Sequence, residues 1–262
     1  MKIFIFTKRK IIIIFLILCI IMAYFLYKYL NRNVQEVYID LECNSMEFED
    51  WKKKVNNLIY GEEKTAYLTF DDGPNNTITP KVLDILKEKD IKASFFVIGK
   101  YVEEYPEIVK REYEEGHYIA NHSYNHDNTK LYKSAESFKN EIEKTDIAIG
   151  KAIGVENYSS HIFRFPNGFM APLYKEEKKA LVSILEKMDY TYIDWNCLNN
   201  DSMKKYTGSQ LINNLKESSK NKNTLVILMH DTKDVSNSSL VLKESIEFLQ
   251  EQGYEFKNFN DI

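Results

Sequence analysis

Two adjacent carboxylates, Asp71 and Asp72, follow the apolar run TAYLTF at residues 65–70. A Gly-Pro pair comes next, and Asp-Gly is common turn chemistry, so taken alone these two acids indicate only a turn. Two histidines, His122 and His126, stand four residues apart in HSYNH. One turn of helix would direct both imidazoles at a single point, although this spacing is weak evidence by itself.

Polar or ionisable side chains end five separate strand-like runs of the chain. They are Asp71 and Asp72, Asn121 and His122, Arg164, Asp194, and His230 and Asp231. In a parallel barrel the carboxyl ends of the strands share one rim, and active sites form at that rim. The distribution therefore favours a functional site over an isolated turn.

Two histidines and a carboxylate at such a rim would make a three-ligand metal site, with positions left open for water and substrate. Open sites of this kind are typical of catalysis rather than of structure. Imidazole ligands favour Zn²⁺, and Co²⁺, Ni²⁺, Fe²⁺ and Mn²⁺ are alternatives that the ligand types leave open.

From residue 64 onward, short β-rich runs alternate with longer amphipathic stretches. Strands are predicted at residues 65–70, 92–99, 117–120, 161–165, 190–194, 224–230 and 254–259. Helices are predicted at residues 78–89, 103–115, 134–153, 175–188, 208–220 and 238–252. This alternation is typical of an α/β fold, and about seven strands indicate a barrel or near-barrel of parallel strands.

The motifs TFDDGP, HSYNH, RFPNG and LMHD, in this order, resemble those of the NodB-homology polysaccharide deacetylases (carbohydrate esterase family four). The resemblance covers residues 64 to about 259. It implies a distorted (β/α) barrel and removal of acetyl groups from glycans such as peptidoglycan, chitin or xylan. We expect N-deacetylation of N-acetylglucosamine in peptidoglycan. An O-acetyl esterase and a non-catalytic glycan-binding module are the alternatives.

The resemblance also implies a role for each motif residue. The metal ligands would be Asp72, His122 and His126. Asp71 would be the general base on water, and Arg164 would pair with Asp71. His230 would be the general acid for the leaving amine, a task that suits an imidazole near neutral pH.

The partner of the acid histidine is less clear in the segment YIDWNCLNNDSM. Counting from Trp195 aligns Asp201 with the carboxylate that orients His230 in this family, and Asp194 is the alternative. A backbone N–H near Asn167 would stabilise the oxyanion. The expected substrate contacts are Pro166, Asn167, Trp195 and Leu228. For Trp195 and Leu228, a plain core position is an equally good interpretation.

The N-terminus has the pattern of a membrane anchor. Residues 11–27 are uncharged and almost wholly apolar, which corresponds to about 26 Å of helix, and the segment can extend to residue 30. More basic residues precede this segment than directly follow it, which favours a cytoplasmic N-terminus. No small-x-small cleavage site follows, so an uncleaved anchor is favoured over a signal peptide.

These patterns predict a single-pass protein of the cell membrane with an extracellular catalytic domain. The expected parts are a cytoplasmic tail (1–10), a transmembrane anchor (11–30), a stem (31–63) and a deacetylase domain (64–262). Of the 35 basic residues, six lie in residues 1–32, which contain no acid, so the remainder has 29 basic and 39 acidic residues, a net charge of −10. A region with this net negative charge is a poor candidate for nucleic-acid binding. The sequence predicts no protein partner and leaves a Cys43–Cys197 disulfide undecided.

Overall fold

The computed structural model describes residues 22, 24–29, 48–203, 206–232 and 237–262. The chain divides into two compact units, residues 1–51 and 52–262. The predicted anchor at residues 11–30 lies mostly outside the described residues, as do Cys43 and much of the predicted stem. Among the helices that the structure describes, none has the length and apolarity needed to cross a membrane. The anchor therefore stays a prediction.

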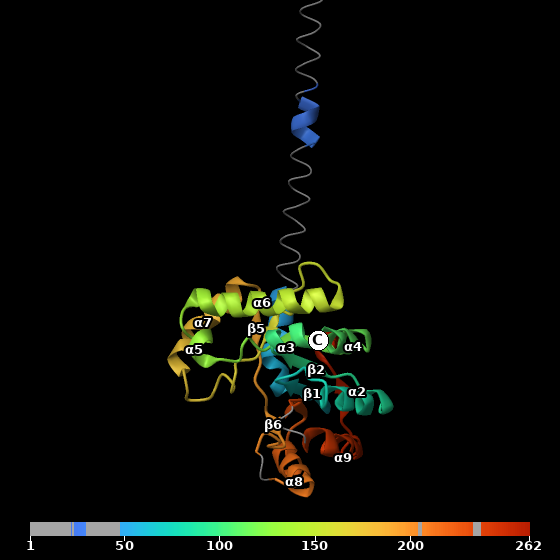
Figure 1. Ribbon diagram of the computed structural model, residues 1–262. Helices are drawn as coiled ribbons and strands as arrows, with labels where there is room; N and C mark the ends of the chain where they lie inside the picture. Colours follow the sequence, from blue (N-terminus) through green and yellow to red (C-terminus); the bar gives the residue numbers. More distant parts are fainter. Residues whose placement is uncertain (1–21, 23, 30–47, 204–205, 233–236) are drawn as a thin grey trace, which may run out of the picture. The chain divides into compact units, whose positions relative to one another are not determined.

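The second unit is built on one sheet in which every paired strand is parallel (Figure 1). Its strands are β1 (Thr65–Asp71), β2 (Ser94–Val97), β3 (Tyr118–Asn121), β4 (Ile162–Phe163), β5 (Thr191–Tyr192), β6 (Cys197–Leu198), β7 (Thr224–His230) and β8 (Glu255–Lys257). Their order is β5-β4-β3-β2-β1-β7-β6, with β8 paired to the first half of β1. All carboxyl ends therefore point to one rim.

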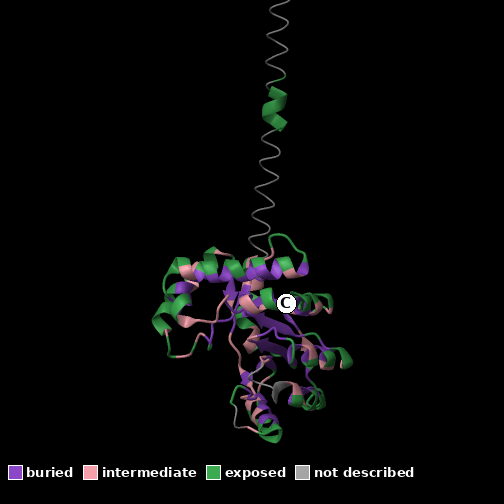
Figure 2. Cartoon of the chain, in the orientation of Figure 1, coloured by how far each residue is buried: buried purple, intermediate pink, exposed green. Residues whose placement is uncertain are grey.

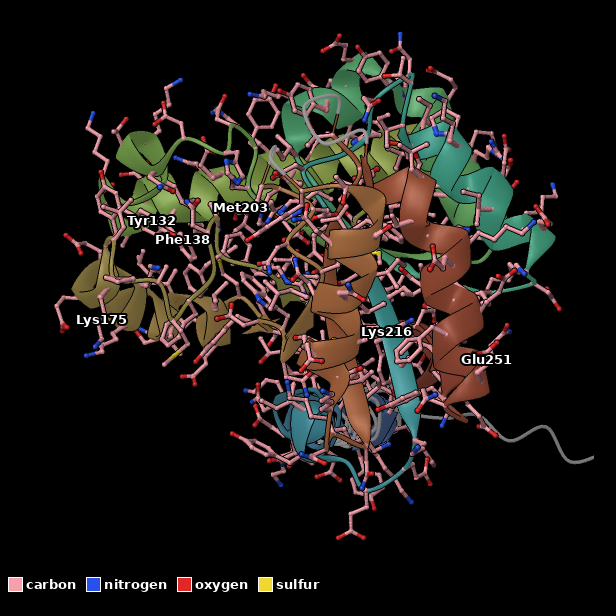
Figure 3. The ribbon with its side chains drawn as sticks, turned by 90° about the horizontal axis from the view of Figure 1, so that it is seen from below. Tyr132, Phe138, Lys175, Met203, Lys216 and Glu251 are labelled. Carbon is pink, nitrogen blue, oxygen red and sulfur yellow. The ribbon has the colours of Figure 1, made fainter. Side chains whose placement is uncertain are left out.

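Helices occupy most of the connections between these strands. They are α2 (Thr79–Glu88), α3 (Gly99–Glu104), α4 (Pro106–Glu114), α5 (Asn128–Leu131), α6 (Ala135–Ile153), α7 (Lys175–Lys187), α8 (Gly208–Ser219) and α9 (Asn237–Glu251). Two short 3₁₀ segments, η1 (Leu58–Tyr60) and η2 (Phe259–Asp261), also belong to the unit, and residues 52–57 just before η1 are helical. In Figure 3, Lys216 of α8 and Glu251 of α9 mark two helices that pack side by side.

The predicted α/β class, parallel strands and seven strand positions are confirmed, but the sheet is not a closed barrel. In the described part of the chain, no hydrogen-bonded ladder joins β5 to β6, so the sheet is open between them. These two strands are consecutive and only residues 193–196 separate them. Parallel neighbours need a crossover of a dozen or more residues, so β5 and β6 cannot pair with one another. The result is a partly open barrel.

Strand alternation separates an apolar face from a face that carries the polar rim. On β1, Ala66, Leu68 and Phe70 belong to the main core beneath the helices. Thr69 and Asp71 alternate with them and therefore point to the other face. Figure 2 shows the strands as buried, while the helices expose their outer sides.

A second core fills the region between α5, α6, α7 and β4. It is made largely of aromatic side chains and includes Tyr132 and Phe138, both labelled in Figure 3. Leu181 and Leu185 attach α7 to this core. The core thereby fixes α7 beside the chain that leaves β4, which matters for the site described next.

Candidate active site

A buried ion pair joins the ends of two strands. Asp71 ends β1 and is 3% exposed, and Arg164, just after β4, is fully buried. The Arg164 Nη1 lies 2.8 Å from Asp71 Oδ1 and 2.7 Å from Thr69 Oγ1. Its Nε donates to the Ile193 carbonyl at 3.0 Å, and its Cζ lies 3.8 Å from the centre of the Phe96 ring. Because its donors find acceptors, the guanidinium can stay buried and hold the Asp71 carboxylate in one orientation.

Asp72, His122 and His126 converge as expected from the motifs. The Asp72 Oδ1 lies 3.5 Å from His122 Nε2 and 3.2 Å from His126 Nε2, and the three ligand atoms lie within 4.8 Å of one another. Among the described residues, this buried oxygen has no hydrogen-bond partner. One carboxylate oxygen facing two imidazole nitrogens is a donor set that fits a divalent cation such as Zn²⁺.

The His122 ring is oriented by its second nitrogen. Its Nδ1 lies 2.8 Å from the carbonyl oxygen of Arg164, so Nδ1–H donates to that oxygen and the Nε2 atom faces Asp72. Carbonyl groups commonly fix metal-binding histidines in this way. The same residue, Arg164, therefore orients the expected base with its side chain and a ligand with its backbone.

The two imidazoles do not come from a helical turn. Residues 122–126 form a loop in which Ser123 and His126 have φ values of +66° and +54°. The Glu141 Oε2 accepts hydrogen bonds from two loop N–H groups at 3.1 and 2.8 Å, and Ser123 Oγ accepts from the His126 N–H at 3.0 Å. These hydrogen bonds hold a loop with left-handed residues in place of the helical turn that the four-residue spacing would suit, and the loop still brings the ring centres to 5.0 Å.

Burial and charge set the protonation of this group. Burial would raise the pKa of Asp72, but the two imidazoles lower it well below its usual range, so the carboxylate stays ionised. Burial, together with the neighbouring imidazole, lowers the pKa of His126. Burial lowers and the Asp71 and Asp72 charges raise the pKa of His122, which ends above its ordinary value. The site thus offers a negative charge that suits a cation.

His230 lies at the end of β7, directly opposite Asp71 in the β1–β7 register. Its Nδ1 lies 2.7 Å from Asp201 Oδ1, and its backbone N–H donates to Asp201 Oδ2 at 2.8 Å. Burial alone would lower the pKa of His230, but the hydrogen bond and charge of Asp201 raise it to about 9. Asp201, the partner expected from the spacing after Trp195, is therefore the residue that contacts His230.

Asp194, the alternative partner of His230, lies elsewhere in the site. Its carboxylate accepts hydrogen bonds from the N–H groups of Phe169 and Met170 at 2.9 and 3.2 Å. These residues belong to the loop that follows the RFPNG motif. Asp194 thus binds a loop beside Arg164.

The expected substrate contacts occupy two regions. Pro166, which is buried, and Asn167, which is exposed, form a turn closed by a 2.7 Å hydrogen bond from the Gly168 N–H to the Phe165 carbonyl. The indole ring of Trp195 lies 5.7 Å from the Arg164 Cζ and is half-buried.

Leu228 precedes His230 by two residues on β7, so it lies on the same face of the sheet, and it is 7% exposed. An acetyl contact and a core position both remain compatible with this placement.

Several residues that support the site were not identified from the sequence. Thr69 was overlooked, although its position two residues before Asp71 places both on one face of β1. Phe96, which packs on the Arg164 guanidinium, and Lys178, which donates to the carbonyl oxygens of Gly168 and Ala171, support the site through tertiary contacts alone, so no sequence motif could reveal them.

Comparisons with known proteins identify the family. Residues 59–193 match the family described as polysaccharide deacetylase. The chain is 32% identical to the peptidoglycan-N-acetylmuramic acid deacetylase PdaA of Bacillus subtilis, over 81% of this chain and 80% of that protein. It is also 32% identical to a peptidoglycan-N-acetylglucosamine deacetylase of Bacillus cereus, over 97% of this chain and 92% of that protein.

A solved structure shares the fold. A Streptococcus mutans CE4 esterase has a TM-score of 0.71 and 26% identity, over 79% of this chain and 90% of that one. The fold, the order of the motifs and these relatives lead to one assignment. The chain belongs to the polysaccharide deacetylase family.

Proposed function

We propose that this protein is a metal-dependent deacetylase that hydrolyses the N-acetyl group of N-acetylglucosamine in peptidoglycan. The observation that carries the proposal is the convergence, at one rim, of a buried carboxylate, a three-ligand set and a carboxylate-paired histidine. Acetyl hydrolysis needs a base, an electrophile and an acid, and these three groups can supply them.

The residues divide the work between the two ends of the reacting bond. Asp72, His122 and His126 would hold a divalent cation, which supplies Lewis acidity that polarises the acetyl carbonyl and makes water a better nucleophile. Asp71, fixed by Arg164, takes the proton from the attacking water. His230 gives a proton to the nitrogen as it leaves, because an unprotonated amine is a poor leaving group.

The choice of substrate rests on the relatives and on charge. The two relatives described above are both named as peptidoglycan deacetylases, one for the muramic acid and one for the glucosamine residue. The net charge of −10 over residues 33–262 disfavours polyanionic polymers and favours a mostly uncharged sugar backbone. The Bacillus cereus relative is matched over more of both chains, which favours N-acetylglucosamine.

An O-acetyl esterase is the second candidate, because the Streptococcus mutans protein that shares this fold is an esterase by name. Ester hydrolysis would use the same base and metal ligands and would rely less on the acid, since an alcohol leaves more readily than an amine. The two functions therefore differ in the substrate that releases acetate.

The test is acetate release by the full chain from three substrates: peptidoglycan, chitooligosaccharides and acetylxylan. Mass spectrometry of the products then shows which sugar carries a free amine. The proposal expects glucosamine from peptidoglycan, with muramic acid still acetylated, and no release by the Asp71→Asn variant. Acetate from acetylxylan alone would establish the esterase in its place, and free amines on muramic acid would change the sugar assignment.

The place of action is a separate proposal. The apolar segment at residues 11–30 and the basic residues before it support an anchor that leaves the catalytic domain outside the cell membrane. A C-terminal epitope should then be accessible to antibody on intact cells whose wall has been removed. An epitope accessible only after lysis would contradict this placement.

A further inference from the structure

A lysine of α7 is buried without a carboxylate partner. Lys178 is 1% exposed, and within the described ranges no carboxylate lies within 4.0 Å of its ammonium group. Its Nζ donates instead to the carbonyl oxygens of Gly168 at 2.7 Å and Ala171 at 3.0 Å. A buried ammonium is costly unless its hydrogen bonds are made, so these two carbonyls are what keep Lys178 in place. In Figure 3, the label on Lys175 marks the start of this helix.

Asp194 binds the same loop through the loop's N–H groups, whereas Lys178 binds its carbonyl groups. Its two carboxylate oxygens accept the N–H groups of Phe169 and Met170. In residues 168–171, two N–H groups therefore donate to the Asp194 carboxylate, and two carbonyl groups accept from the Lys178 ammonium. Hydrogen bonds to charged groups are stronger than neutral ones, so this loop is fixed in one conformation.

The backbone of Asp194 connects this loop to the ion pair of the expected base. The Arg164 Nη2 donates to the Asp194 carbonyl at 3.3 Å, and its Nε donates to the preceding carbonyl, that of Ile193. The same guanidinium binds the Asp71 carboxylate. Asp194 thus contacts the base's partner through its backbone and the loop through its side chain.

The loop begins at the turn that carries Asn167. Asn167 has φ +66° and Gly168 has φ +85°. A Cβ on Gly168 would lie 2.8 Å from the Trp195 ring, so the turn is packed against that indole. Within the described part of the chain, the Asn167 N–H has no hydrogen-bond acceptor, and the residue is exposed. The turn therefore presents an unused backbone donor at the rim.

We propose that Asp194 and Lys178 are positioning residues that hold this turn so that the Asn167 N–H is fixed as an oxyanion donor. The inference rests on the proposed function, because an oxyanion arises only if the site hydrolyses an acyl group. A fixed donor stabilises the transition state more than the substrate, and a small displacement weakens it strongly. Loss of either residue should therefore lower kcat and leave KM and metal binding nearly unchanged.

The test compares Asp194→Asn and Lys178→Met with two matched controls. Lys179→Met removes the next lysine of α7, which is exposed and paired with Glu176, and Asp189→Asn changes an exposed acid five residues before Asp194. At a temperature well below each melting point, kcat should fall about 10- to 100-fold in the two test variants. KM, metal content and both controls should stay within about twofold. The double variant should lose less than the product of the two single losses, because both act on one loop.

Amide hydrogen exchange of residues 167–171 supplies a second readout that needs no substrate. Exchange should rise in Asp194→Asn and Lys178→Met and stay as in the wild type in the controls. If Lys178→Met does not fold, Asp194→Asn alone decides the outcome. Folded test variants that keep the wild-type kcat would overturn the inference. A wild-type protein that releases no acetate from any acetylated glycan would instead overturn the proposed function.

Discussion

Replacing Asp201 by Asn should move the basic limb of the pH–rate profile. His230 must carry a proton to act as the general acid, and although burial lowers its pKa, the hydrogen bond and charge of Asp201, with smaller contributions from Asp71 and Asp72, raise the pKa to about 9. A raised pKa keeps the proton on the imidazole to higher pH, so the wild type should lose activity only as the pH passes about 9. Without the Asp201 charge, the limb should move down towards ~6.5, the ordinary value for histidine.

The expected loss depends on pH in a way that can be worked out. At pH 8, about 90% of the imidazole is protonated with a pKa of about 9, but only ~3% with a pKa of ~6.5. The variant should therefore be ~30-fold slower at pH 8 and less than ~1.5-fold slower at pH 6 from this cause. A general loss of structure would instead lower the rate at both pH values alike.

The assay is the initial rate of acetate release between pH 5.5 and 9.5, measured as kcat/KM at equal metal loading. The free enzyme's essential groups determine this profile. Asp194→Asn is the matched control, because Asp194 binds the loop at residues 168–171 and should leave the basic limb in place. An unmoved limb in Asp201→Asn together with a shifted one in Asp194→Asn would refute the assignment of the partner.

Three further predictions concern the ligands, the base and the turn after them. Asp71→Asn should keep the metal and lower kcat by ~10³-fold or more, because the base is lost. Asp72→Asn should lose the metal as well as the activity. The opposite pattern would show that the roles of Asp71 and Asp72 are exchanged. His126→Ala should lower the metal content well below one per chain by elemental analysis, and an unchanged content would exclude this ligand set. Gly73→Ala should lower the free energy of unfolding by ~1–3 kcal/mol in denaturant titrations, since its Cβ would overlap the carboxylate of the buried Asp231. Unchanged stability would contradict this packing.

Much of the sheet could be predicted because its longest strands carry strong patterns. The run at residues 224–230 is apolar at nearly every position, and β7 has the same bounds. By contrast, β6 has two residues, too few for any alternation, and was missed. The opening of the barrel between β5 and β6 was not predicted either, because it depends on β6, which follows β5 after only residues 193–196.

In the site too, residues placed by the strand topology could be predicted, and features that depend on tertiary contacts could not. Asp71, Asp72 and His230 follow strands, so their common rim could be predicted from topology alone. The path of the HSYNH segment could not be predicted in this way, because it depends on hydrogen bonds that two of its N–H groups donate to Glu141, in a helix further along the chain. Lys178 was missed because a lysine in an amphipathic helix is normally exposed.

The most direct test of the central claim is a titration of the chelated protein with Zn²⁺, followed by acetate release from peptidoglycan. The rate should be near zero after chelation and should rise in proportion to added Zn²⁺ until one equivalent per chain is bound. His126→Ala should not be restored at the same concentration. Full acetate release by the metal-free protein would contradict the account.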